Sequence, residues 1–240
     1  MKFVLKYKYY YILLTLSLSI VACDSGDIYE ETTFKNEGIK CNTSIIFKNI
    51  SSWPIDYQVA IAAYKKEEAI PSISKAIGKP SIGDTTHIEL TGIPFDTDRI
   101  SISILNKSRK SVTDLYSHSI QPKEIESQIS SLGLLSIDLL DFTRVQNQFF
   151  SNCINCHGGS SYAAADLNLT EGYSYNALVN VNSKIVNEKK LVTPGIESES
   201  FILDVLAHSS DNISYNHTNV SFNSQEEDVK LLKLWINSLK

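Results

Sequence analysis

The spacing of apolar residues changes near residue 137, and this change limits the chain to two different kinds of structure. Before it, apolar and polar residues alternate, most clearly over residues 99–104, as expected of a strand with one buried face. After it, apolar residues recur at intervals of three and four positions, from Leu139 to Phe149, which is typical of an amphipathic helix. The sequence therefore predicts a β-rich part followed by a helical part.

The first part, residues 41–121, is expected to form a small antiparallel β-sandwich. Turn residues such as Pro54 and Gly92 separate short apolar runs, as turns separate strands. The expected strands cover residues 43–50, 57–61, 85–90, 99–104 and 112–120. Several short strands in about eighty residues are typical of a sandwich.

The second part, residues 137–240, is expected to be all-α, after a linker at residues 122–136. Ser136 is positioned to cap a first helix over residues 137–151. Ser224 with Glu227 forms the pattern of a capping box at the start of the last helix. Residues 174–181 and 198–207 are expected to form shorter helices.

The N-terminus has the pattern of an export signal. Three lysines precede an apolar run over residues 12–21, which is shorter than the roughly 20 residues that a membrane span needs and fits a signal peptide. The run ends at Ala22-Cys23, similar to the lipobox of bacterial lipoproteins. We expect a lipoprotein signal peptide at 1–22, lipidation of Cys23 and a tether at 23–40; an ordinary signal peptide with an incidental cysteine is the alternative.

Charge and cysteine content exclude two further classes of protein. The chain has 27 acidic and 22 basic residues, a net charge of −5, whereas nucleic-acid binding requires a basic face; no nucleic-acid partner is expected. If Cys23 carries lipid, three of the four cysteines remain, and an odd number does not describe a disulfide framework. Cys41 is expected to be a small buried residue near the start of the first strand.

The motif Cys153-Ile154-Asn155-Cys156-His157, followed by two glycines, carries the chemistry of the chain. Two thiols at this spacing reach the two vinyl groups of one haem, and the adjoining histidine binds its iron. A thioredoxin-type redox pair is a weaker alternative, because it would need a preceding strand in a βαβ unit. A zinc site would need a second pair of ligands, which the chain lacks. One covalently attached haem c is therefore predicted.

Residues 137–240 resemble the class I cytochromes c found in bacterial lipoproteins. The matching segments are residues 149–159, 166–169, 174–179, 192–195, 200–203 and 231–236. The resemblance implies an all-α cytochrome c domain whose first and last helices cross and enclose the haem edge, with His157 as the proximal ligand. It also implies that the Pro194 carbonyl accepts the other ring N–H of His157, a contact that would fix the ligand's tautomer.

The sixth iron ligand departs from this resemblance. The family uses a methionine there, but Met1 is the only methionine of the chain. His217 lies ahead of Trp235, about where that methionine is expected, and an imidazole can replace a thioether on haem iron. His208, at the end of a short helical segment, is the alternative ligand, and an open or water-bound iron is the third possibility.

Together these features predict a membrane-anchored, exported electron carrier rather than an enzyme. It is expected on the periplasmic or outer-membrane face, held by lipid on Cys23 and exchanging single electrons with redox partner proteins. Its redox potential is expected to be low, because methionine ligation raises the redox potential and the chain has no methionine after Met1. The alternatives are a haem domain whose open sixth position binds a small gas or peroxide, and a partner-binding β module with an accessory cytochrome.

Overall fold

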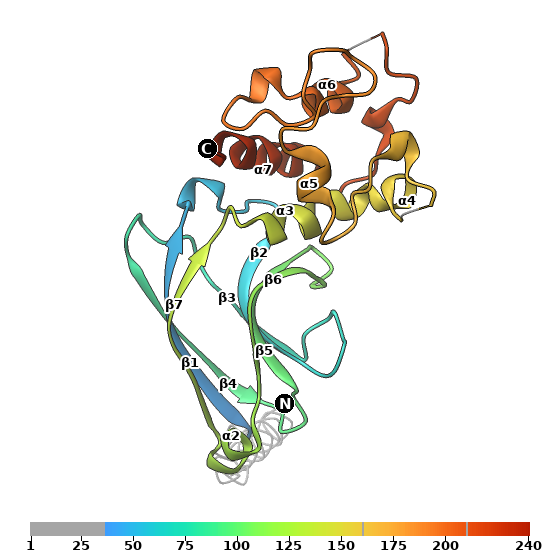
Figure 1. The fold of residues 1–240 in the computed structure, drawn as a ribbon. Helices are drawn as coiled ribbons and strands as arrows, with labels where there is room; N and C mark the ends of the chain where they lie inside the picture. The colour runs from blue at the N-terminus through green and yellow to red at the C-terminus, as the bar shows by residue number, and fades with distance from the viewer. Residues whose placement is uncertain (1–36, 160, 210) are drawn as a thin grey trace, which may run out of the picture. The chain divides into compact units, whose positions relative to one another are not determined.

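The computed structural model describes residues 37–159, 161–209 and 211–240 of the 240-residue chain. Glu37–Lys240 form one compact unit (Figure 1). The predicted signal peptide, the lipidation site Cys23 and most of the predicted tether lie outside the described residues. None of the described helices is long and apolar enough to cross a membrane.

Seven described strands form two sheets (Figure 1). The three-stranded sheet has the order β4-β1-β7, with β1 at Ile39–Lys48, β4 at Thr85–Ile93 and β7 at Ile129–Asp138. The four-stranded sheet has the order β3-β2-β5-β6, with β2 at Gln58–Tyr64, β3 at Ile73–Ala76, β5 at Arg99–Leu105 and β6 at Ser111–Ser119. All pairings are antiparallel except β1 with β7, which is parallel.

The helices of the described chain are short, apart from the last. They are α2 at Pro122–Ser127, α3 at Phe142–Gln148, α4 at Ile154–His157, α5 at Ser174–Leu178, α6 at Phe201–Ala207 and α7 at Gln225–Ser238. The 3-10 turns are η1 at Ile50–Ser52, η2 at Phe150–Asn152, η3 at Ala164–Asp166, η4 at Glu197–Glu199 and η5 at His217–Asn219.

The first hydrophobic core is built by the alternating strands. Ile100, Ile102 and Ile104 of β5 are fully buried in it, and burying a side chain of this size contributes about 1.5–3 kcal/mol. Cys41 of β1 is fully buried in the same core, which confirms it as a small buried residue near the start of the first strand. Burial also raises the pKa of the Cys41 thiol to about 11.

A second core lies between α3, α7 and the shorter helices. Its buried residues are Val145, Phe149, Phe150, Leu169, Leu178, Val192, Leu231, Leu232, Trp235 and Ile236. The helix-spaced apolar residues of α3 and α7 meet here, with the Phe142 and Trp235 ring centroids 5.0 Å apart. Asp141 caps α3 by accepting a 2.8 Å hydrogen bond from the Thr143 N–H.

A buried carboxylate joins the segment before β2 to α3 and α7. Asp228, at the start of α7, is 0% exposed. It accepts a 2.7 Å hydrogen bond from the Tyr57 hydroxyl and a 2.8 Å bond from the Gln148 side chain of α3. Burial raises the pKa of Asp228 despite these donors. The network therefore ties the connection before β2, α3 and α7 together at one point.

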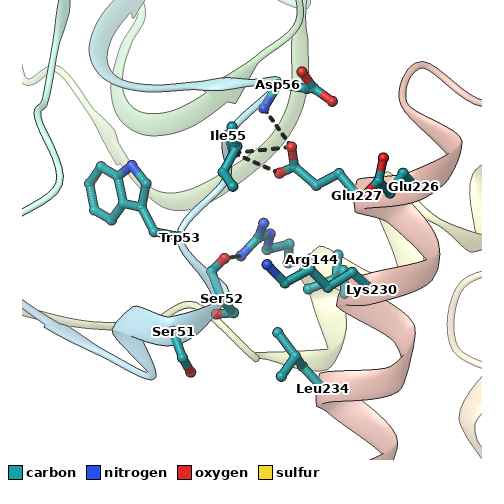
Figure 2. Close-up of a pocket in the computed structure, with 11 residues that line it drawn as sticks. Ser51, Ser52, Trp53, Ile55, Asp56, Arg144, Glu226, Glu227, Lys230 and Leu234 are labelled. Carbon is teal, nitrogen blue, oxygen red and sulfur yellow. Dashed lines mark hydrogen bonds between the residues drawn. The ribbon is translucent and has the colours of Figure 1, made fainter.

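Two further contacts cross the same junction (Figure 2). Arg144 of α3 is 1% exposed and donates a 2.8 Å hydrogen bond to the Ser52 carbonyl. Glu227 of α7 accepts hydrogen bonds from the backbone N–H groups of Ile55 and Asp56. Because buried polar groups are costly to leave unpaired, these bonds hold the loop after β1 against α7.

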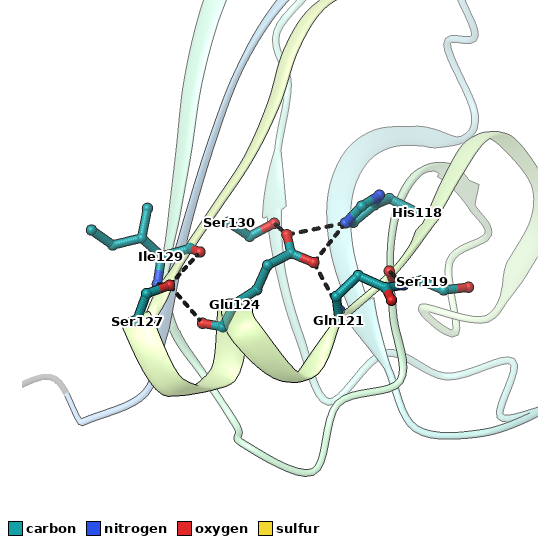
Figure 3. A network of polar contacts seen from close by, with 7 residues as sticks. All are labelled: His118, Ser119, Gln121, Glu124, Ser127, Ile129 and Ser130. Carbon is teal, nitrogen blue, oxygen red and sulfur yellow. Dashed lines mark hydrogen bonds and ion pairs between the residues drawn. The ribbon is translucent and has the colours of Figure 1, made fainter.

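Glu124 organises the return of the chain between β6 and β7 (Figure 3). Its carboxylate accepts hydrogen bonds from the Gln121 N–H at 2.7 Å and the Ser130 hydroxyl at 2.6 Å, and it pairs with His118 at 3.1 Å. Burial by itself would raise the pKa of Glu124, but Ser130, Gln121 and His118 together lower it. The ionised carboxylate therefore caps the N-terminus of α2 and holds the start of β7 in place.

The predicted fold class, a small antiparallel sandwich followed by a separate all-α cytochrome c domain, is wrong. The described chain is mostly β-sheet, with only short helices and a C-terminal helix of modest size. Residues 122–136, predicted as a linker, form α2 and most of β7, and β7 pairs in parallel with β1. Beyond Asp138, bridges such as Val179 with Val192 add short extended contacts, so this part is not all-α.

A bulge explains why β7 escapes detection in the sequence. Asn42 pairs with Ser131 and Thr43 with Gly133, so Leu132 is an extra residue in the ladder. Gly133 adopts a left-handed φ of 67° there. A one-residue bulge reverses which face each later side chain occupies. The alternation is interrupted in the middle of the strand, and neither half is long enough to stand out.

The other expected elements are partly confirmed. The five expected strands correspond to β1, β2, β4, β5 and β6, whereas β3 was not expected. The expected helix at 137–151 begins only at Phe142, because β7 extends to Asp138, so the Ser136 cap is wrong. Ser224 is the N-cap of α7, but the predicted capping box is absent: the Ser224 hydroxyl donates to Asp56, and Glu227 accepts from the Ile55 N–H.

Candidate functional site

The two motif cysteines lie on one turn of helix. Cys153 is the N-cap of α4, and its carbonyl accepts hydrogen bonds from the N–H of Cys156 at 3.2 Å and of His157 at 2.9 Å. Positions three apart on a helical turn share a face. Cys153 packs partly buried against the second core, Cys156 is exposed, and both are free thiols. Both sulfurs are thus present for attachment to one group.

The two glycines after the motif are required by close packing. A Cβ on Gly158 would lie 2.2 Å from the Ile154 carbonyl oxygen. Gly159 has a φ of 97°, and a Cβ there would lie 2.7 Å from the Tyr162 ring. Only glycine satisfies both positions. The chain therefore turns sharply out of α4 directly after His157.

The loop after the motif returns beneath His157 and orients its ring. The His157 carbonyl accepts a 2.7 Å bond from the Leu169 N–H, and its Nδ1 lies 3.0 Å from the Ala164 carbonyl oxygen. A carbonyl can only accept, so Nδ1 carries the proton and Nε2 presents a lone pair. The Pro194 carbonyl was expected in this role; the structure places Ala164 there instead. The Gly195 N–H, directly after Pro194, donates to the Ile236 carbonyl of α7. This bond holds the turn at Pro194 against α7.

His217 is held in the same way from another part of the chain. It begins η5, which Asn216 caps by accepting a 3.0 Å bond from the Thr218 N–H. Its Nδ1 lies 3.0 Å from the Tyr215 carbonyl oxygen, so Nε2 again presents the lone pair. Burial, together with the charges of His157 and His208, lowers the pKa of His217 and outweighs the Tyr215 carbonyl. The neutral, ligand-competent imidazole is therefore favoured.

The fold brings the rings of His157 and His217 next to each other. Their ring centroids are 6.2 Å apart, with 23° between the ring planes. Two metal–imidazole bonds of about 2.0–2.1 Å, together with the two half-rings, span about 6 Å. Two imidazoles that bound one metal through Nε2 would lie at about this centroid separation, so His157 and His217 are close enough to hold the same metal. The alternative ligand His208 instead ends α6 in a left-handed conformation with φ 49° and is exposed.

Large apolar and aromatic side chains are exposed close to the pair. Ile154, Tyr162 and Tyr215 are large and exposed next to the motif, the glycine turn and His217, respectively. Within residues 37–159, 161–209 and 211–240, no group of three or more His, Cys, Asp or Glu is arranged to hold a bare metal ion. Haem iron receives four ligands from its porphyrin, so two imidazoles complete its coordination. The donor set fits haem.

Sequence reasoning missed the two carbonyls that orient the histidines. Ala164 and Tyr215 act through their backbones, so their side chains carry no signal of this role. No model of a known protein family matches the chain, and a search of curated proteins finds no significant match. The assignment of this site therefore depends on the geometry and chemistry of Cys153, Cys156, His157 and His217 alone.

Proposed function

We propose that this chain is an exported electron carrier with one haem attached covalently through Cys153 and Cys156. The observation that carries the proposal is the adjacent pair of His157 and His217 beside two free thiols. The CxxCH motif supports it independently, because this spacing is the sequence signature of covalent haem attachment. The proposal depends on these side chains and not on a cytochrome c fold.

Each residue of the site has a defined role in this proposal. The two cysteine sulfurs would hold the haem as thioethers, and His157 and His217 would ligate its iron through Nε2. The carbonyls of Ala164 and Tyr215 fix both tautomers and increase the basicity of both imidazoles. Haem, when bound, supplies an iron that gains and loses one electron. If both histidines ligate the iron, no position would be left for a substrate at the metal, and the site would only exchange electrons.

Ligand type and charge set the direction of the potential. Histidine in place of methionine lowers it, and the net charge of −5 favours the more positive oxidised centre. We therefore expect a low-potential couple. The signal pattern and Cys23 support export and a lipid anchor, which would place the carrier among redox proteins at a membrane surface.

A set of visible spectra of the exported, full-length protein tests the proposal. We expect haem that stays bound after denaturation, a low-spin spectrum in both oxidation states, and no change when carbon monoxide is added to the reduced protein. Redox titration of the same sample should give a potential below the range of His/Met cytochromes. Complete loss of haem on denaturation would refute covalent attachment. An exported protein that contains no haem would refute it as well.

Substitution of the two candidate histidines tests the ligand assignment. His217→Ala should give a partly high-spin spectrum and rapid carbon monoxide binding, because one axial position is opened. His208→Ala is the matched control and should leave the spectrum unchanged. An unchanged low-spin spectrum in His217→Ala removes this residue from the site, and carbon monoxide binding by the wild type supports the open-site alternative.

A further inference from the structure

A cavity of about 270 Å³ lies at the junction between the loop after β1 and helix α7 (Figure 2). It is separate from the histidine pair and its cysteines. Residues 51–56 supply one wall, α7 supplies the other, and Arg144 of α3 lies between them. Pockets for drug-sized ligands begin at about 300 Å³. This cavity is slightly smaller, so it suits a ligand smaller than a typical drug.

Arg144 is the feature that points to a ligand. Its side chain is 1% exposed. Nε donates to Gln148, and Nη1 donates to the Ser52 and Leu139 carbonyls. Among the described residues, no hydrogen bond uses its Nη2. Nη2 is not among the buried side-chain atoms that lack a partner, so this N–H group opens into the cavity, where water or a ligand can accept a hydrogen bond from it.

The remaining charges of the cavity limit the ligand to at most a single negative charge, placed next to Arg144 and Lys230. The Glu227 carboxylate is already bonded to two backbone N–H groups, and the Asp56 carboxylate accepts from the Ser224 hydroxyl. Lys230 makes no ion pair within the described part of the chain, so its ammonium remains available beside Arg144. Three carboxylates line the cavity, with that of Glu226 at its exposed edge, and they would repel a multiply charged anion.

The other walls are apolar. Trp53, Leu231 and Leu234 line the cavity, and Ile55 lies at its edge with 79% of its surface exposed. An isoleucine this exposed gains from an apolar partner that covers it. The cavity thus combines a buried donor, a nearby ammonium and apolar walls.

We infer that this cavity binds a small monocarboxylate with an apolar body. Its carboxylate accepts from the free Nη2 of Arg144 and lies close to Lys230, and its apolar body contacts Trp53, Ile55 and Leu234. The site does not depend on haem. It is built on α3, whose C-terminal end leads directly into the turn that precedes Cys153.

Calorimetric titration of the full-length exported protein with 3-phenylpropionate tests this inference, with 3-phenylpropanol as the uncharged comparison and inorganic phosphate as the second anion. We expect saturable binding of the carboxylate and none of the alcohol. Lys230→Met keeps the alkyl chain and should weaken binding about threefold to fivefold. The matched control Lys233→Met changes an exposed lysine of α7 outside the cavity and should not change it.

Arg144→Lys removes the Nη2 donor and should abolish measurable binding where circular dichroism shows that the variant is folded. If that variant does not fold, Lys230→Met decides the question. Equal binding of acid and alcohol, binding of phosphate alone, binding that Lys230→Met leaves unchanged, or no binding of any probe would each overturn the inference.

Discussion

Replacing Asp228 by alanine should destabilise the whole described unit, because this carboxylate joins the segment before β2 to α3 and α7. Its removal leaves the Tyr57 hydroxyl and the Gln148 amide, both buried, without an acceptor, at a cost of about 1–3 kcal/mol each. Burial of the charge offsets part of this cost, as the raised pKa of Asp228 indicates. We therefore expect a net loss of about 2–4 kcal/mol and a Tm lower by about 5–15 °C.

Urea unfolding followed by circular dichroism measures this change, and the two tryptophans report on each core separately. Trp53 packs against the first core and Trp235 lies in the second. In single-tryptophan variants of the wild type, both should show the same midpoint, because the junction makes the two cores cooperative. Asp228→Ala should lower both midpoints and separate them.

Asp228→Asn is the matched control, because it keeps one acceptor oxygen and should cost only about 1 kcal/mol. A double-mutant cycle with Tyr57→Phe should give a coupling free energy of about 0.5–3 kcal/mol. A cost below about 1 kcal/mol for Asp228→Ala, or two separate midpoints in the wild type, would show that the junction does not connect the two cores.

Two further substitutions test local features of the fold. Gly158→Ala should lower the free energy of unfolding by about 1–3 kcal/mol, because the added Cβ would lie 2.2 Å from a carbonyl oxygen. Gly78→Ala is the control, because Gly78 has open space around it. Equal urea midpoints for the two variants would contradict this prediction. Because the pKa of Glu124 is lowered from 4.5 on folding, its contribution is present above that pH and is lost as the pH falls through the folded value. Urea midpoints measured from about pH 7 to pH 3 should therefore show Glu124→Gln losing less stability on acidification than the wild type, and parallel curves would refute it.

Much of the sheet could be predicted from alternation alone. Ile100, Ile102 and Ile104 recur at every second position, and all three are buried in the first core. β7 could not be predicted, because the bulge at Gly133 shifts its alternation by one residue. Its pairing partner β1 is about ninety positions away, and a parallel pairing at that distance leaves no local signal.

The residues of the candidate site were also only partly predictable from the sequence. Cys153, Cys156 and His157 are recognisable because their spacing is local and carries a defined chemistry. His217 could be proposed only by its position relative to Trp235, and the structure places its ring 6.2 Å from that of His157. Ala164 could not be found, since a backbone carbonyl has no residue signature, and the expected Pro194 lies in a turn bonded to α7.

The sequence by itself determined which segments alternate, and that two thiols and a histidine share one turn of chain. These properties depend on contacts a few residues apart. Only the tertiary structure decided that β7 joins β1, that Asp228 ties the segment before β2 to α7, and that His157 and His217 lie next to each other. Each of these joins residues many positions apart, and such pairs form only when the folded chain buries its apolar surfaces together.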